Sequence, residues 1–504
     1  MTDIVSIDPR TGAAVETVAA ETSEARLDAA CRAAAGAADG LAALGRSGRA
    51  RMLRAMAAEL EADRETVVGL ADRETALGTA RLNGELTRTR FQLELFADSV
   101  EEGSYVEATL DSPGETPMGP RPDLRRMLVP LGPVAVFGAS NFPLAFSVPG
   151  GDTAAALAAG CPVLAKAHPA HPATSERCFA ALQRGAAAAG APDGTVGLVH
   201  GTEAGAALVA HPAVRAVGFT GSLSGGRALF DIASTRPDPI PFYGELGSVN
   251  PLVVTPGAAA ARPQEVADGV TASFTLGAGQ FCTKPGLVFL PDDDAGLAVA
   301  ERMAGAAAQL APGVLLSEQV RGGYESGARR LAEAGGVRLL AEGTAPGAQG
   351  WGAPVRLMSV AAADLTAQTA EECFGPATLL VTYRDQAELA VALEAVPGSL
   401  TATLIAEDAE EALAAELEPV LRAKAGRIVY NGYPTGVAVA WGMNHGGPWP
   451  ATTSALHTSV GVHSIRRFLR PMAWQNTPQA LLPDELRDAP QDPLPRRVDG
   501  ELRR

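Results

Sequence analysis

The feature that most constrains this chain is a regular alternation of strand-like and helix-like segments from about residue 124 onward. Short apolar runs such as VAVFG, PVLAK and TVGLV alternate with alanine-rich stretches that have the apolar spacing of helices. Strands that alternate with helices in this way form a mainly parallel sheet with helices on both faces. Ligands of such sheets bind beyond the carboxyl ends of the strands, so functional residues are expected directly after each strand.

The alternation occurs in two blocks, and the second runs from about 250 to 435 with strands such as GLVFL, ATLLVTY and RIVYNG. Before the first block, residues 22–107 have apolar residues at three- and four-residue spacing, which predicts three long helices. A chain of 504 residues is also too long for one compact core. We therefore expect an α/β protein with two domains, each built on a mainly parallel sheet.

The charge and composition exclude several classes of partner. The formal net charge is −16, whereas nucleic acids and anionic membrane surfaces are bound through clustered Lys and Arg. The start of the chain lacks the basic and apolar segments of a signal peptide, and no apolar run approaches the roughly 20 residues of a membrane-spanning helix. We therefore expect a cytoplasmic protein that acts on a small molecule rather than on nucleic acid or a membrane.

The cysteines and histidines do not have the spacing of a disulfide framework or a metal site. The 5 cysteines are scattered and show no CxxC spacing: Cys31, Cys161, Cys178, Cys282 and Cys373. His168 and His171 are close in the chain, but the proline after each prevents a helix from aligning the two rings. We therefore expect no metal site.

Two stretches that follow predicted strands have the chemistry to bind a ligand. FGASNFP ends a strand with small residues and places the Asn141 amide at the rim of the sheet. FTGSLSGG opens a helix with Gly221, Ser222 and Gly226, and the free N–H groups of such a helix start attract a phosphate. Taken alone, each stretch also fits an ordinary turn or loop.

Two further stretches supply candidates for acid–base and nucleophilic chemistry. YGELGSVNP places Glu245 at an apolar strand end, where partial burial is expected to raise the pKa of its carboxyl towards neutrality, as a general base requires. GAGQFCTKPG places Cys282 in a loop of small residues before a strand. An exposed strand-end glutamate and a buried small hydrophobe remain the alternatives for these two positions.

Together these stretches resemble one family. GASNFP, FTGS, ELG, GQFC and EECFGP occur in the order and spacing of the NAD(P)-dependent aldehyde dehydrogenase superfamily, which the chain resembles over nearly its whole length. GSVNP, HGGPWPATT and RFLRPMAWQNTPQALLP resemble the branch of α-ketoglutaric semialdehyde (2,5-dioxovalerate) dehydrogenases and NADP-dependent fatty-aldehyde enzymes. The resemblance implies a Rossmann-like cofactor domain of residues 1–107 and 125–244 and a catalytic domain of residues 245–435. Segments 108–124 and 460–504 would form an oligomerisation element of a homodimer or homotetramer.

The resemblance implies that Cys282 is the nucleophile, whose thiolate attacks the aldehyde carbon to form a thiohemiacetal. It makes Glu245 the base, and it assigns the Asn141 amide and the Cys282 backbone N–H to the developing oxyanion. Loss of hydride gives a thioester, which Glu245 hydrolyses by activating water. Aldehyde dehydrogenases that transfer the acyl group to coenzyme A generally lack this glutamate, so hydrolysis is expected. A non-catalytic scaffold relative would need none of these residues.

The resemblance also implies a cofactor site. The positions that match the family's cofactor contacts are Lys166 at the adenosine ribose, Gly221, Ser222 and Gly226 at the pyrophosphate, and Glu372 and Phe374 at the nicotinamide ribose. In NAD-preferring members a glutamate three positions after the lysine accepts the ribose hydroxyls, but this chain has Pro169 there. Because Lys166 and His168 are close by and no carboxylate repels a 2′-phosphate, we expect NADP as the cofactor, with NAD as the alternative.

The substrate pocket departs from the pattern of the branch. Its semialdehyde enzymes often have one arginine in the third helix and another near the C-terminus, but here those positions are Glu94 and Leu456. Arg88, Arg90 or His457 would then have to bind a substrate carboxylate. The aromatic candidates for pocket walls are Phe91, Phe142, Phe281, Trp441 and Trp449. We expect α-ketoglutaric semialdehyde or a related small semialdehyde as substrate, with a neutral medium-chain or hydrophobic aldehyde as the alternative.

Overall fold

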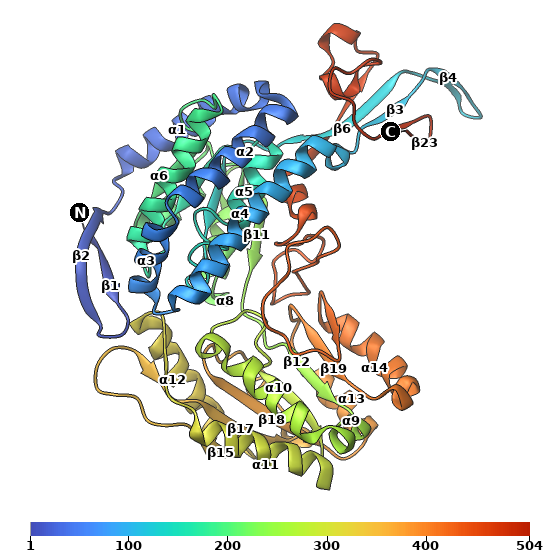
Figure 1. The fold of residues 1–504 in the computed structure, drawn as a ribbon. Coiled ribbons are helices and arrows are strands. Elements are labelled where there is room, and N and C mark those ends of the chain that lie inside the picture. Colours follow the sequence, from blue (N-terminus) through green and yellow to red (C-terminus); the bar gives the residue numbers. More distant parts are fainter. Residues whose placement is uncertain (1, 504) are drawn as a thin grey trace.

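The computed structural model describes residues 2–503, which form two lobes and a projecting arm (Figure 1). Within this range the first lobe is built on a 5-stranded sheet, the second on a 7-stranded sheet and the arm on another 5-stranded sheet. A hairpin of β1 (Asp3–Asp8) and β2 (Ala13–Ala20) lies at the outer side of the first lobe. None of the helices in residues 2–503 combines the length and apolar composition needed to cross a membrane.

The sheet of the first lobe is parallel throughout, as the strand–helix alternation predicts. Its strands occur in the order β11-β10-β7-β8-β9. Their bounds are β7 (Val134–Phe137), β8 (Val163–Lys166), β9 (Val196–Val199), β10 (Ala216–Thr220) and β11 (Phe242–Glu245). Alternate residues of a strand point to opposite faces, so Val134 and Val136 of β7 enter one hydrophobic core while Ala135 and Phe137 enter another.

Helices cover both faces of this sheet. Those that connect its strands are α5 (Gly151–Ala159), α6 (Pro172–Ala188), α7 (Thr202–Ala210) and α8 (Leu223–Thr235). The N-terminal region contributes α1 (Glu24–Ala43), α2 (Gly45–Ala62), α3 (Arg64–Thr75) and α4 (Thr79–Glu102). The prediction of three long helices over 22–107 is therefore wrong in number. The chain breaks at Gly45, which has a φ of 64°, and again at Asp63 and Ala76, where the apolar spacing gives no warning.

The sheet of the second lobe is also mainly parallel. Its strands occur in the order β15-β17-β18-β13-β12-β19-β20. Of the strand pairs described in this sheet, only β15–β17 is antiparallel. The strands are β12 (Pro251–Val254), β13 (Leu287–Pro291), β15 (Arg338–Glu342), β17 (Arg356–Ala361), β18 (Ala377–Tyr383), β19 (Ala402–Ile405) and β20 (Ile428–Tyr430). Its helices are α9 (Pro256–Ala261), α10 (Pro263–Thr275), α11 (Asp294–Gln309), α12 (Glu318–Ala332), α13 (Gln386–Glu394) and α14 (Glu411–Lys424). The short strands β14 (Gly313–Val314) and β16 (Gly352–Ala353) pair beside it.

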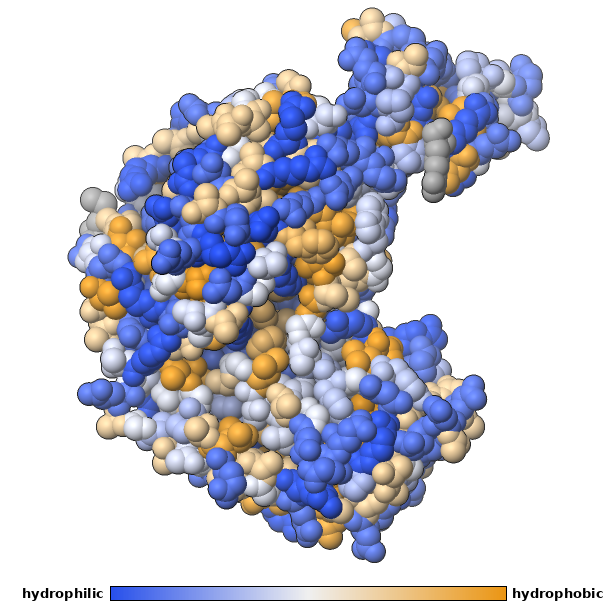
Figure 2. Space-filling model, in the orientation of Figure 1, coloured by the Kyte–Doolittle hydropathy of each residue, from blue (hydrophilic) through white to orange (hydrophobic). Residues whose placement is uncertain are grey.

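The arm brings together two segments that are far apart in the sequence. Its sheet has the order β21-β6-β3-β22-β23, and a separate hairpin of β4 and β5 extends from it. The strands are β3 (Thr109–Asp111), β4 (Gly114–Thr116), β5 (Gly119–Arg121), β6 (Leu124–Pro130), β21 (Leu469–Gln475), β22 (Arg496–Val498) and β23 (Glu501–Arg503). Figure 2 shows that the molecule is hollowed between the arm and the second lobe, with apolar side chains on the wall of the hollow. An oligomerisation role for the arm stays a prediction.

Candidate active site

The predicted functional residues lie at one edge of the first sheet because its strands are parallel and in register. Phe137, which precedes the Asn141 stretch, pairs with Lys166 across β7 and β8. Thr220, which precedes the Ser222 turn, pairs with Glu245 across β10 and β11. The carboxyl ends of four strands thus point their connecting loops towards the second lobe, as expected for an α/β ligand site.

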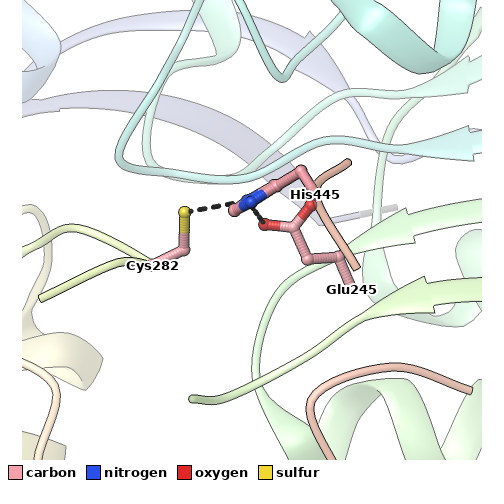
Figure 3. A group of neighbouring side chains, drawn as sticks. All are labelled: Glu245, Cys282 and His445. Carbon is pink, nitrogen blue, oxygen red and sulfur yellow. Dashed lines mark hydrogen bonds and ion pairs between the residues drawn. The ribbon is translucent and has the colours of Figure 1, made fainter. Parts of the chain in front are cut away.

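Three side chains from separate parts of the chain meet at the junction of the lobes (Figure 3). Glu245 ends β11, Cys282 lies in the loop before β13, and His445 lies in the segment after β20. His445 Nε2 is 2.9 Å from Glu245 Oε1 and 3.4 Å from Cys282 Sγ. The Cys282 sulfur, the His445 ring nitrogen and the Glu245 carboxylate oxygen all lie within 4.8 Å of one another, so the carboxylate is close enough to accept the thiol proton.

His445 is the functional residue that the sequence analysis missed. It occurs in the stretch HGGPWPATT, which suggested a family branch but no role for the histidine. Its side chain is fully buried, its backbone N–H donates to Thr458 Oγ1, and Nδ1 has no partner within residues 2–503. A proton on Nδ1 would be a buried, unpaired donor, so the proton belongs on Nε2, from which it is donated to Glu245.

The prediction that burial raises the pKa of Glu245 is wrong in direction. Burial does favour the uncharged acid, but the interaction with His445 and a hydrogen bond from the Ser459 hydroxyl outweigh it, so the pKa is lowered. The Ser459 hydroxyl lies 2.5 Å from Glu245 Oε2. Glu245 is therefore a carboxylate at neutral pH, able to accept a proton from the thiol or from water.

Cys282 differs from the other cysteines in its exposure. Cys31, Cys161, Cys178 and Cys373 are buried, whereas Cys282 is partly accessible. Burial of the thiol raises its pKa well above the usual value, and the negative charges of Glu245 and Glu372 add to this effect. The thiol is thus protonated at neutral pH and requires the neighbouring base for attack.

The Asn141 amide lies beside the loop that carries Cys282. Its Nδ2 donates to the Gln280 carbonyl at 2.8 Å, and the Asn141 backbone carbonyl accepts a hydrogen bond from Arg81 Nη2 at 2.6 Å. Asn250 Nδ2 donates to the Cys282 carbonyl at 2.8 Å and holds the loop from the other side. A primary amide has two N–H donors, so Asn141 keeps one in addition to the bond to Gln280.

A cavity of about 280 Å³ lies against Cys282. Its other walls are Arg88, Phe142, Phe146, Phe281 and residues 435–438. Of the predicted wall residues, the structure therefore brings Arg88, Phe142 and Phe281 to the thiol.

The remaining candidates for the pocket lie elsewhere. Trp449 is 50% exposed, and Phe91 and Trp441 are also exposed. His457 bonds to Ser454 and lines a separate small cavity behind Glu245. Arg90 is held by ion pairs with Glu61 and Glu94 on the outer side of α4, so it does not face the thiol.

The turn of residues 219–226, which is predicted to bind a phosphate, has free backbone N–H donors. Ser222 caps α8, and its Oγ accepts the Gly225 N–H, while the Gly221 N–H donates to the Glu245 carbonyl. The N–H groups of Leu223 and Ser224, in the first turn of α8, have no helical acceptor and remain available to an anion.

Three further cofactor candidates are Gly226, Glu372 and Phe374. Gly226 allows close approach of α8 to the strand, because a Cβ there would lie 2.2 Å from Leu246 Cδ2. Glu372 lies across the junction in the second lobe, where burial raises its pKa to about 7 and a hydrogen bond from the Ser248 backbone opposes the shift. Phe374 is half-buried two residues further on.

The surroundings of Lys166 differ from those predicted. Burial lowers the pKa of Lys166 to about 8, and the charge of Glu21 opposes this shift. Glu21 follows β2 and lies against Gly201, where a Cβ would be 2.1 Å from its Oε1. A carboxylate therefore does lie near Lys166, although the sequence has Pro169 at the family position.

His168 does not supply the second cation that the sequence suggested. Its ring stacks on His171 with 5.3 Å between centroids, and its Nδ1 accepts the Ala170 N–H. Burial lowers the pKa of His168 far below its usual value, and His171 and Lys166 add to this effect. The ring is uncharged at neutral pH and stabilises the turn after β8.

Comparisons with known proteins identify the family of the chain. The sequence model of the aldehyde dehydrogenase family matches residues 1–472. The α-ketoglutaric semialdehyde dehydrogenase 2 of Azospirillum brasilense is 47% identical over 508 residues, covering 98% of this chain and 95% of that protein. The α-ketoglutaric semialdehyde dehydrogenase of Acinetobacter baylyi is 44% identical over 426 residues, covering 84% of this chain and 81% of that protein.

Solved structures show the same fold. An aldehyde dehydrogenase from Bacillus cereus in complex with NAD+ superposes with a TM-score of 0.80 at 20% identity, covering 94% of each chain. A 1-pyrroline-5-carboxylate dehydrogenase from Thermus with bound NAD gives a TM-score of 0.80 at 23% identity, covering 94% of this chain and 89% of that one. The family model, the curated relatives and the fold agree, and this chain belongs to the aldehyde dehydrogenase family.

Proposed function

We propose that this aldehyde dehydrogenase oxidises α-ketoglutaric semialdehyde, or a related short aldehyde with a terminal carboxylate, to the corresponding acid. The observation that carries the proposal is the cluster of Cys282, His445 and Glu245 beside a cavity that also contains Arg88. The two relatives named for this substrate are 47% and 44% identical to the chain. A nucleophile, a base and a carboxylate-binding cation are the groups that this reaction requires.

The proposed reaction starts with transfer of the thiol proton to the Glu245 carboxylate. His445 Nε2 lies within hydrogen-bond distance of both groups. Once the carboxylate is protonated, the Nε2–H donates to the new thiolate instead. The thiolate attacks the aldehyde carbon, and the Asn141 amide and the Cys282 backbone N–H donate to the oxyanion. After Glu245 has released the thiol proton to solvent, it takes a proton from water, and the hydroxide displaces the Cys282 thiolate from the acyl carbon. The thiolate then regains a proton from Glu245, and the acid is released.

The residues at the strand ends fit a dinucleotide. The open N–H groups of α8 suit a pyrophosphate, Lys166 suits the adenosine ribose, and Glu372 suits the nicotinamide ribose. NAD(P), when bound, supplies the acceptor for the hydride that leaves the thiohemiacetal. We propose NADP as the preferred form because Lys166 can neutralise a 2′-phosphate and Pro169 offers no acceptor to a ribose hydroxyl.

The substrate proposal is tested by comparing kcat/KM for α-ketoglutaric semialdehyde and pentanal, which have the same number of carbons. We expect the semialdehyde to be preferred by about 100-fold, because a buried, charge-assisted pair contributes several kcal/mol. Equal values, or a preference for pentanal, would contradict the proposal and favour a neutral aldehyde as substrate.

Glu21 is expected to limit the preference for NADP. Glu21→Gln removes the carboxylate near Lys166 and should raise the NADP-to-NAD ratio of kcat/KM about fivefold or more, since a like charge at about 4 Å costs about 1 kcal/mol even at the dielectric constant of water. Glu24→Gln, three residues along on exposed helix surface, is the matched control and should leave the ratio unchanged. An unchanged ratio in Glu21→Gln would place Glu21 outside the cofactor site.

A further inference from the structure

Arg88 is a partly buried cation without an anionic partner at the wall of the Cys282 cavity. It lies on α4, and its guanidinium stacks on Phe146 at 4.8 Å from the ring centroid. Nη2 donates to the Val437 carbonyl at 3.1 Å, whereas Nη1 is buried and has no hydrogen-bond partner within residues 2–503. No ion pair of Arg88 occurs in that range either, which is costly for a buried charge unless a ligand completes it.

The nearest carboxylate on the same helix does not neutralise Arg88. Glu85 lies one turn earlier, and its Oε1 accepts the N–H groups of Leu144 and Ala145 at 2.8 and 2.9 Å. Burial raises the pKa of Glu85, against those two hydrogen bonds and the charges of Arg81 and Arg88, and Glu85 makes no ion pair with Arg88 within residues 2–503. An arginine keeps its charge even when burial lowers its pKa, as it does here.

Two other arginines of α4, Arg81 and Arg90, do not line the cavity. Arg90 pairs with Glu61 at 2.8 Å and with Glu94 at 3.2 Å, and all three lie away from the cavity. Arg81 donates to the Asn141 carbonyl and stacks on the outer sides of Phe142 and Phe281, and it is not part of the cavity wall.

We propose that Arg88 binds the terminal carboxylate of the substrate, so that the enzyme selects short aldehydes that carry an acid at the far end of the chain. The inference rests on the proposed function and deepens it, because it names the group that recognises the substrate. The thiol and the guanidinium share one cavity of about 280 Å³, in which the Phe142 and Phe281 rings contact the carbon chain between the two ends. The two positions that lack the branch arginines do not affect this pocket, because Glu94 is ion-paired outside it and Leu456 is 92% exposed.

The inference is tested with Arg88→Gln, Arg88→Lys and the matched control Arg90→Gln, each assayed with α-ketoglutaric semialdehyde and pentanal. Arg88→Gln should lose about 100-fold or more in kcat/KM for the semialdehyde, chiefly through KM, and less than about tenfold for pentanal. Arg88→Lys should recover part of the loss, because it keeps the charge without the fork of donors. Arg90→Gln should retain the wild-type preference.

A binding readout separates recognition from a general defect. The product α-ketoglutarate should slow the alkylation of Cys282 by iodoacetamide in the wild type, and much higher concentrations should be needed in Arg88→Gln. Equal losses for both aldehydes, or unchanged protection by α-ketoglutarate, would overturn the role of Arg88. If the wild type itself prefers pentanal, the proposed function fails whatever the variants do, so the two failures are distinguishable.

Discussion

Cys282→Ala is expected to abolish aldehyde oxidation and to leave cofactor binding intact. The thiol is the only partly accessible one among the 5 cysteines, and it lies 3.4 Å from His445 Nε2, so no other sulfur can take its place. Loss of a nucleophile that acts together with its base typically costs about 10⁴-fold or more in rate. Steady-state cofactor reduction measures the loss, and calorimetric titration with NADP measures the retained binding.

Cys31→Ala is the control for this prediction. Cys31 is buried in α1 of the first lobe, where no catalytic candidate lies, so this variant should keep its activity. Substantial turnover in Cys282→Ala would remove the thiol from the mechanism. Loss of NADP affinity together with activity would instead assign Cys282 a structural role in holding the loop before β13.

The parts of the fold that could be predicted are those encoded locally. The alternation of apolar runs and alanine-rich helices predicts both parallel sheets, because each strand and its following helix are contiguous in the sequence. Parallel pairing then brings successive strand ends to one edge, and for this reason Asn141, Lys166, Ser222 and Glu245 lie together. The number of N-terminal helices was missed, since the breaks at Gly45 and Asp63 interrupt no apolar pattern.

The parts that could not be predicted depend on contacts between distant segments. Glu245 and His445 are 200 residues apart, and the hydrogen bond between them reverses the expected direction of the Glu245 pKa shift. Glu21 reaches the vicinity of Lys166 from the N-terminal hairpin, which no spacing rule around Lys166 reveals. Apolar neighbours in the sequence indicate that a side chain is buried. They do not reveal the charged or hydrogen-bonding partner that decides whether its pKa is raised or lowered.

The substrate-binding residue is a further feature that the sequence alone does not identify. The absence of arginine at Glu94 and Leu456 argues, by alignment alone, against a carboxylate-bearing substrate. Both positions lie outside the cavity, and the cation inside it, Arg88, occurs six residues before Glu94 on the same helix. An alignment compares residues position by position. An arginine at a neighbouring turn of the same helix can nevertheless place its guanidinium in the same pocket.

Glu245→Gln is expected to stall the enzyme after the first half of the reaction, with the acyl group held on Cys282 as a thioester. Glutamine cannot take a proton from water, so hydrolysis should fall by about 10²- to 10⁴-fold, the usual contribution of a general base. Formation of the thioester should be slowed but not lost, because glutamine cannot accept the thiol proton, whereas removal of the Glu245 charge, which raises the pKa of the Cys282 thiol, increases the fraction of thiolate at neutral pH. The expected result is a burst of reduced cofactor of at most one equivalent per enzyme, and an acyl adduct on the Cys282 peptide by mass spectrometry.

His445→Asn separates the two duties of the carboxylate. It removes the imidazole that lies between Glu245 and Cys282 but keeps Glu245 as the base for water, so it should slow the attack by the thiol without accumulating an adduct.

A Glu245→Gln enzyme with normal steady-state turnover would exclude Glu245 as the hydrolytic base. Release of the trapped acyl group by added coenzyme A, but not by water, would show that the thioester is open to a thiol acceptor and that only the water-activating carboxylate directs this enzyme to a free acid.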